Sequence, residues 1–227
     1  MTSAASPASP NTSARGRVIA ALMALLAEQP FERIGMTDIA KRADVPLPEL
    51  RDLFGSTLAI LAARTKELDR AVLAASDADM AEEPPRERLF DVLMRRIELL
   101  EPEKAAVRSL LRSAMRNPPL ALALNGIAVR SQQWMLTAAD IDAAGPRGMA
   151  RAQGLAVLFA SVLRTWVDDD DPGRARTMAA LDRALARGQQ WAGLLDGLDR
   201  MARCVTNPRR RRNQESDRYR ESESRSV

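Results

Sequence analysis

The sequence predicts an all-α protein, in which an N-terminal three-helix helix-turn-helix domain is joined by a long fourth helix to a C-terminal helical bundle. Three observations predict this fold class. Aromatic residues make up only 4% of the 227 residues, while Ala, Leu and Arg abound, which favours helices over sheets. Apolar residues recur at helical spacing in successive segments that Pro or Gly separates. Residues 36–54 have the pattern of two short helices around a tight turn.

The helix-turn-helix prediction depends on this last segment. The residues expected to face the core are small or apolar: Ile39, Ala40, Ala43, Val45, Leu50, Leu53 and Phe54. Thr37 is placed to cap the first short helix. Asp44 stands where the chain must leave that helix in a left-handed conformation, which Asp tolerates better than most residues. Two short helices joined in this way are typical of a helix-turn-helix.

Residues 17–61 resemble the N-terminal domain of TetR-type transcription regulators. The resemblance rests on the turn at Asp44, the aromatic Phe31 in the preceding linker, a fourth helix opening at Phe54, and the apolar residues of the first helix, which are Ile19, Leu22, Leu25 and Leu26. It implies a homodimer whose paired N-terminal domains bind a palindromic DNA operator. It also implies a C-terminal bundle that binds a small ligand, which we expect to be mainly apolar because the bundle stripes contain few polar groups. The residues expected at the DNA are Arg17, Thr37, Lys41, Arg42, Leu47, Glu49, Arg51 and Asp52.

The surface expected to meet DNA departs from the family pattern. Where the family typically has Ser, Lys, Gly and Thr followed by Tyr, this chain has Pro46, Leu47, Pro48, Glu49 and Arg51. Each proline removes an N–H donor for a phosphate, and Glu49 repels one. The positive side chains of residues 15–57 are Arg15, Arg17, Arg33, Lys41, Arg42 and Arg51, and the negative ones are Glu28, Glu32, Asp38, Asp44, Glu49 and Asp52. The segment is therefore neutral, and it lacks the excess positive charge on which DNA affinity largely depends.

The remaining chain divides by composition. The predicted parts are a disordered tail at 1–14, the helix-turn-helix domain at 15–60, a ligand-binding and dimerisation domain at 61–188, an amphipathic helix at 189–206 and a basic disordered tail at 207–227. Helical spacing of apolar residues predicts helices over 58–76, 88–100, 104–115, 118–144, 148–167 and 174–187. Trp134 is expected on the apolar stripe of the 118–144 helix. The acidic run at 168–171 is expected to be a solvated loop without a metal, because adjacent side chains in a loop diverge.

The segment 148–167 is more apolar than its neighbours, but its uninterrupted apolar run is too short to span a bilayer. It is expected to be either the central helix of the bundle or half of a dimer seam. Gly154, Ala156, Ala160 and Ser161 would let a second helix approach closely, and the same small residues would also suit the wall of a cavity.

The composition argues against an enzyme. The chain has no His and one Cys, so it has neither a disulfide framework nor an ordinary zinc site, and Cys204 has no His to activate it. No pair of carboxylates at a helix-face spacing and no phosphate-binding Gly loop occurs. We therefore expect no catalytic residues, no metal and no cofactor, in a reducing, cytoplasmic setting.

The C-terminal part supports a second interpretation. The predicted amphipathic helix carries Trp191, Leu194, Leu195, Leu198 and Met201, and it would either dock on the bundle or lie in a membrane interface. The tail at 207–227 has seven arginines against four acids, which would attract nucleic acid or anionic lipid. Residues 88–112, the helix with Trp134 and residues 165–185 are similar to the lipid-binding accessory proteins of ubiquinone biosynthesis, which keep a TetR-like fold without acting as repressors. This resemblance implies, as the alternative, an isoprenoid- or phospholipid-binding protein, peripheral on the inner membrane surface.

Overall fold

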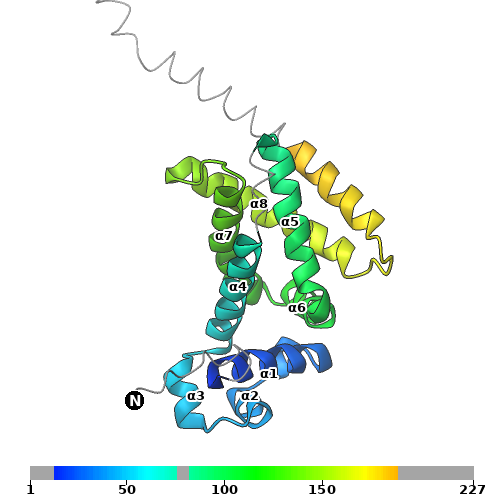
Figure 1. The fold of residues 1–227 in the computed structure, drawn as a ribbon. Helices are drawn as coiled ribbons and strands as arrows, with labels where there is room; N and C mark the ends of the chain where they lie inside the picture. Colours follow the sequence, from blue (N-terminus) through cyan, green and yellow to red (C-terminus); the bar gives the residue numbers. More distant parts are fainter. Residues whose placement is uncertain (1–12, 76–81, 189–227) are drawn as a thin grey trace, which may run out of the picture. The chain divides into compact units, whose positions relative to one another are not determined.

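The computed structural model describes residues 13–75 and 82–188, and every regular element in these two ranges is a helix (Figure 1). The all-α prediction is confirmed for this part of the chain. The elements are α1 (Ala14–Glu28), the 3-10 turn η2 (Phe31–Arg33), α2 (Met36–Ala43), α3 (Leu47–Leu53), α4 (Thr57–Ala74), α5 (Pro85–Leu100), the 3-10 turn η4 (Glu101–Glu103), α6 (Lys104–Arg116), α7 (Pro118–Ala138), α8 (Gly145–Trp166) and a helix over 175–188. Among these helices, none combines the length and the apolarity that crossing a bilayer requires.

The first three helices pack around the N-terminal half of α4, and we call α1, η2, α2 and α3 the head (Figure 1). Local capping sets where the helices begin. The Ser13 hydroxyl accepts the Gly16 N–H at 3.1 Å before α1, and the Ser56 hydroxyl accepts the Ala59 N–H at 3.1 Å before α4. The head core is filled by apolar side chains, of which the most deeply buried are Val18, Leu22, Leu26, Ile39, Leu50 and Ile60.

The turn between α2 and α3 has the predicted left-handed residue. Asp44 has φ 51° and ψ 54°, and the next amide, Val45 N, reaches back to Ala40 O at 3.1 Å. The prediction for Asp44 is confirmed. The prediction that Thr37 caps α2 is wrong. Gly35 is the N-cap residue and α2 begins at Met36, so Thr37 is already part of the helix. The carboxylate of Asp38 accepts the Gly35 N–H at 2.9 Å, so it occupies the N-terminus of α2 and leaves Thr37 inside the first turn.

The predicted long fourth helix is present, and it belongs to two hydrophobic cores. Its first half contributes Ile60 and Leu61 to the head core, and its second half contributes Leu68 and Val72 to the core of α5 to α8. Phe54 does not open this helix as expected; it ends α3 and is buried in the head. One continuous helix therefore contributes to both cores.

The body, by which we mean the second half of α4 together with α5 to the helix over 175–188, encloses the second core. Its most deeply buried apolar side chains are Leu93, Ile97, Met135, Trp166 and Leu181. Gly148 is required where α8 begins, because a Cβ at this position would lie 2.0 Å from the carbonyl carbon of Ala143. The prediction that Trp134 lies on the apolar stripe is wrong, since this side chain is 57% exposed. Neighbouring Met135 is buried, and adjacent helical residues point about 100° apart.

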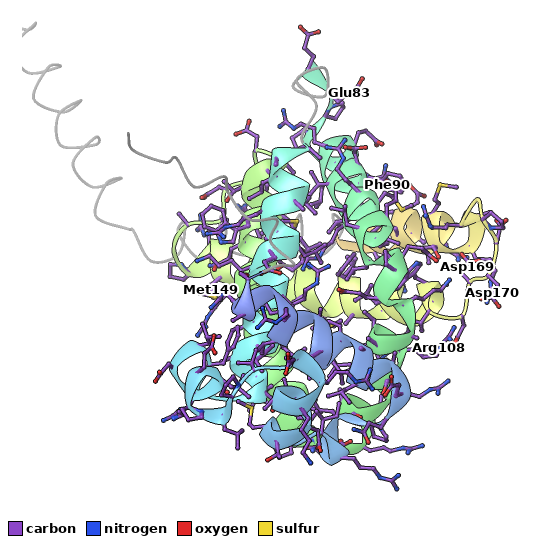
Figure 2. The ribbon with its side chains drawn as sticks, turned by 60° about the horizontal axis from the view of Figure 1, so that its bottom comes forward. Glu83, Phe90, Arg108, Met149, Asp169 and Asp170 are labelled. Atoms are coloured by element: carbon purple, nitrogen blue, oxygen red, sulfur yellow. The ribbon has the colours of Figure 1, made fainter. Side chains whose placement is uncertain are left out.

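Helices α7 and α8 pack on each other, and each leaves apolar side chains exposed. Asn125 of α7 and Gln153 of α8 join the pair through two amide hydrogen bonds of 2.9 and 3.0 Å. On the outer side, Leu122 is 74% exposed and Val157 is 61% exposed. Met149 of α8, labelled in Figure 2, is also exposed.

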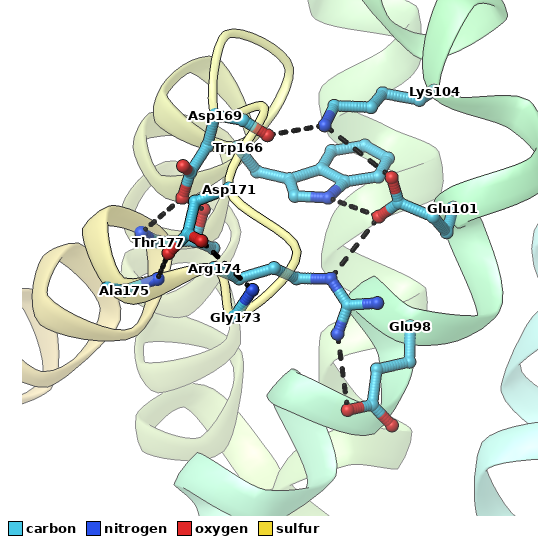
Figure 3. Close-up of polar contacts among 10 residues, drawn as sticks. All are labelled: Glu98, Glu101, Lys104, Trp166, Asp169, Asp171, Gly173, Arg174, Ala175 and Thr177. Atoms are coloured by element: carbon cyan, nitrogen blue, oxygen red, sulfur yellow. Dashed lines mark hydrogen bonds and ion pairs between the residues drawn. The ribbon is translucent and has the colours of Figure 1, made fainter.

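The loop between α8 and the last helix is held by polar contacts (Figure 3). The Trp166 Nε1–H donates to Glu101 at 3.1 Å, and Arg174 bridges Glu101 and Glu98 at 3.3 and 3.4 Å. The expectation of a fully solvated acidic run is wrong for Asp169, which is 1% exposed. Its Oδ2 accepts the N–H and the hydroxyl of Thr177 at 2.9 and 2.6 Å, and these bonds hold its pKa below the usual value.

Candidate nucleic-acid interface

The residues predicted to contact DNA all lie on the surface of the head. The structure places Arg17 on α1, Thr37, Lys41 and Arg42 on α2, and Leu47, Glu49, Arg51 and Asp52 on α3, each of them exposed. Helix α2 contacts both α1 and α3, so the residues come from one part of the fold. Their assignment to DNA contact stays a prediction. What the structure adds is which of the charged side chains are already engaged.

Arg17 holds the end of α2. Its Nε donates to Ala43 O at 3.1 Å, and its Nη2 donates to Asp44 O at 3.4 Å. Both acceptors are carbonyls at the C-terminus of a helix, where the helix dipole favours a cation. Arg17 therefore helps to fix the turn that orients α3.

Arg42 is joined to the last residue of α1. Its Nη1 and Nη2 donate to the two carboxylate oxygens of Glu28 at 2.9 and 2.5 Å. The hydrogen bonds from Arg42 lower the pKa of Glu28. A phosphate that approached Arg42 would have to compete with this fork-to-fork pair. Two of the opposite charges that make residues 15–57 neutral thus form a specific ion pair, Arg42 with Glu28.

The N-terminus of α3 offers few donors to a phosphate. Pro46 is the residue before the helix, and Pro48 lies in its first turn, so two of the positions that would carry free N–H groups have none. Glu49 adds a negative charge in the same turn. Of the four predicted DNA-contacting cations, Arg17 is engaged by backbone carbonyls and Arg42 by Glu28, whereas Lys41 and Arg51 have no hydrogen bond or ion pair among the described residues.

The body contains a buried polar cluster that the sequence did not predict. Asp69 of α4 and Arg96 of α5 form an ion pair, with exposures of 7% and 6%, and the Ser131 hydroxyl donates to Asp69 Oδ1 at 2.7 Å. The guanidinium also lies 5.9 Å from the ring centroid of Phe159. Burial lowers the pKa of Arg96, and the charge of Asp69 opposes that effect. Gln132, also buried, has an Oε1 without a hydrogen-bond partner among the described residues.

This cluster corrects the expectation that the bundle core has few polar groups. A signal was present in the sequence. Arg96 stands three residues after Leu93 and four before Leu100, which places it on the apolar stripe of α5. A ligand that entered this core would therefore meet charged and polar groups as well as aliphatic ones.

Several predicted residues lie outside the described ranges. These are the membrane and lipid residues Trp191, Leu194, Leu195, Leu198 and Met201, together with Cys204 and the basic tail at 207–227. Within the described ranges, no group of three His, Cys, Asp or Glu residues is placed to hold a metal ion.

Comparison with known proteins relates this arrangement to solved structures. Neither a protein-family model nor a curated protein matches the chain. A TetR transcriptional regulator from Nitrosomonas europaea is 21% identical, with a TM-score of 0.59, and the match covers 78% of this chain and 98% of that one. A TetR transcriptional regulator from Rhodococcus sp. RHA1 is 22% identical, with a TM-score of 0.55, over 77% of this chain and 95% of that one. A putative TetR-family transcriptional regulator from Syntrophomonas wolfei is 13% identical, with a TM-score of 0.54, over 80% of this chain and 96% of that one. The chain therefore has the fold of the TetR-type transcription regulators, as the resemblance of residues 17–61 implied.

Proposed function

We propose that the chain is a cytoplasmic, homodimeric, DNA-binding transcription regulator whose body binds a small ligand. The observation that carries this proposal is the α2–turn–α3 unit, fixed by Asp44 and Arg17 and presenting the outer face of α3 to solvent. The fold that it shares with solved transcriptional regulators supports the same function. Leu47 and Arg51 are the side chains of α3 that we expect to reach base edges, and Lys41 is expected to contact a phosphate.

DNA binding is tested with the full-length protein and labelled fragments from around its own gene. Fluorescence anisotropy at low salt should show retention of at least one fragment. K41Q and R51Q should each weaken binding by about fivefold to a hundredfold, as loss of one charged contact does. R70Q is the matched control, because Arg70 is an exposed arginine on α4. Binding of no fragment by the wild-type dimer would overturn the regulator proposal.

The outer face of α7 and α8 supports the dimer part of the proposal. Leu122, Trp134, Met149 and Val157 are exposed there, and at Gly126 and Gly154 an added Cβ would meet nothing within 4 Å. Exposed apolar patches of this kind mark contact surfaces, and the two glycines would let a second copy approach closely. Of the four small residues predicted for a seam, Gly154 and Ser161 are exposed, Ala160 is partly exposed and Ala156 is buried.

The dimer is tested by light scattering during size-exclusion chromatography. L122D and V157D should each convert the protein to monomers, because a carboxylate in the centre of an apolar contact would be buried without a partner. M115D is the control, since Met115 is an exposed apolar residue on α6, outside this face. A monomeric wild-type protein would contradict the proposed contact.

The lipid-binding alternative stays a prediction, because its amphipathic helix lies outside the described residues. It is tested by mass spectrometry of lipids that copurify with the protein and by flotation on anionic liposomes, with and without residues 189–227. Copurified isoprenoid or phospholipid, together with flotation that requires 189–227, would favour the alternative if no DNA fragment binds.

A further inference from the structure

Helix α6 lies between the two hydrophobic cores and has three distinct faces. Ala106 and Leu110 pack into the head core, whereas Val107 and Leu111 pack against the body core. The third face carries polar residues that recur every three or four positions, as neighbours on one side of a helix do. This face meets the C-terminal end of α1 and the turn that follows it.

A groove of about 750 Å³ separates this third face from the end of α1. Arg108, Arg112 and Arg116, spaced by one helical turn, line its α6 wall, and Glu28 and Glu32 line the opposite wall. The volume lies within the range of small-molecule sites, about 300 to 1,000 Å³. The groove is therefore large enough for a small organic molecule.

The acidic groups of the groove are already engaged. Glu28 is held by Arg42 through two hydrogen bonds. Glu32 accepts the Ser113 hydroxyl at 2.9 Å, and its pKa is lowered by its own backbone N–H, by Ser113 and Asn117 and, to a smaller extent, by the charge of Arg116. Both acidic side chains therefore have partners: Glu28 is paired with an arginine, and Glu32 accepts a hydrogen bond from a serine.

The basic groups are engaged less completely. Arg112 is exposed in the middle of the three arginines, and it makes no ion pair or hydrogen bond within the ranges that the structure describes. Arg108 donates through Nη2 to Val167 O, but its Nε lies 3.6 Å from Asp168 Oδ1, which is an ion pair without a hydrogen bond. Figure 2 shows Arg108 on the same side of the ribbon as Asp169 and Asp170. Arg112 therefore carries unused cationic donors, and Arg108 adds positive charge to the same wall, although its Nε is buried.

We propose that this groove binds a small anionic molecule, whose carboxylate or phosphate is held by Arg112 and Arg108. Arginine presents a planar fork of donors that suits both groups. The apolar part of such a molecule would lie against Ala27, Pro30 and Ala105, which also line the groove. The site is separate from the buried polar cluster of the body and from the outer face of α3. It is independent of whether the head binds DNA.

Binding in this groove would affect the contact between head and body, because α6 and the residues that follow α1 form both the groove and that contact. Phe31 N donates to the Ser113 hydroxyl at 3.2 Å, and the Ser109 hydroxyl donates to Gln29 O at 3.2 Å. A ligand bound across α1 and α6 adds a further connection between the same two helices. It should therefore stabilise the protein against unfolding by mass action.

The test is isothermal titration calorimetry of the full-length protein at low ionic strength, with citrate and inorganic pyrophosphate as separate probes. Either probe should bind, and the one that binds identifies the anionic group. R112Q should raise the Kd by roughly tenfold or more, as expected for loss of a charged hydrogen-bond donor. A105E, which places a carboxylate in the groove, should abolish binding.

The control is R70Q, for which the Kd should change by less than about twofold, a difference below 0.5 kcal/mol on the same scale. Circular dichroism shows whether each variant is folded before it is titrated. Equal affinities of wild-type, R112Q and A105E proteins would overturn the proposal, because the anion would then bind elsewhere. Absence of heat with both probes on the wild-type protein would overturn it as well.

Discussion

The buried pair of Asp69 and Arg96 gives the strongest prediction about stability. In D69N the side chain keeps its shape but loses its charge, which leaves a buried guanidinium without its acidic partner. The positive charge of Arg64 also acts on Arg96, so the remaining cation would be further disfavoured. Removing one partner of a buried ion pair typically costs about 3–5 kcal/mol. We therefore expect the free energy of unfolding to fall by about that amount.

Two further variants separate the charge effect from simple packing. S131A removes one hydrogen bond to the carboxylate and should cost about 1.5–3 kcal/mol. The double variant D69L/R96M removes both charges while keeping apolar volume. Replacement of a whole buried ion pair by apolar side chains is often neutral or stabilising. The double variant should therefore be more stable than D69N, although it differs from the wild type at two positions.

The measurement is urea unfolding followed by tryptophan fluorescence in a W134F/W191F background. Trp166 then reports alone, and it is buried in the same core as Arg96. Far-UV circular dichroism provides a second probe of whether the transition is two-state. The reasoning is refuted if D69N loses less than about 1 kcal/mol, or if the double variant is less stable than D69N.

Three further predictions follow from local geometry. In the monomeric L122D background, G148A should lose about 1–3 kcal/mol, because its methyl group would overlap backbone, whereas G126A, at a helical position that is open in the single chain, should gain up to about 1 kcal/mol. D44G should match or exceed the wild type in urea unfolding, and D44A should be less stable than D44G by about 1 kcal/mol, because the left-handed φ disfavours a Cβ. T177V removes a donor to Asp169, whose pKa is lowered in the folded state. The stability that this bond adds is present above about pH 4 and is lost as the pH falls through the lowered pKa. The free energies of unfolding of wild type and T177V should therefore converge in acid.

Each of these three has a result that would contradict it. G148A as stable as G126A would mean that the chain before α8 shifts at little cost. A loss of stability in D44G would show that the Asp44 side chain, and not its backbone angle, matters at the turn. A constant difference between wild type and T177V from pH 6 to pH 3 would remove Asp169 as the titrating group.

The fold was predictable because its signals are local. Helical spacing of apolar residues and the breaks at Pro and Gly are visible in short windows, and Asp44 marks the turn within such a window. The errors arose where two local signals compete. Thr37 and Asp38 are both able to cap α2, and the carboxylate at the third position is the one in contact. The apolar run Trp134, Met135, Leu136 leaves open which side chain points outward, and packing buries Met135 and Leu136 while Trp134 is exposed.

The polar cluster and the ion pairs of the site were not predictable in the same way. Asp69 and Arg96 are 27 residues apart, and Arg42 and Glu28 are 14 apart. Which cation meets which anion depends on helix packing, and a sum of charges does not contain that information. The sequence showed that the segment 15–57 is neutral, but only the fold shows that Arg42 is neutralised locally while Lys41 and Arg51 are not.

This distribution of charge has a consequence for how the head would bind DNA. If Lys41 and Arg51 are the main phosphate contacts from each head, a dimer would neutralise about four phosphates, and log K would fall with log salt with a slope of about −3.6. A protein with such a shallow slope must obtain much of its specific affinity from base contacts, here from the outer face of α3. Two heads carry twelve positive side chains in all, which corresponds to a slope of about −11, so a steeper slope would require positive charge from outside the heads. The strongest concentration of such charge in the sequence is the run of four arginines at 209–212. The salt dependence of any DNA complex therefore distinguishes recognition by the head alone from recognition that also uses the basic tail.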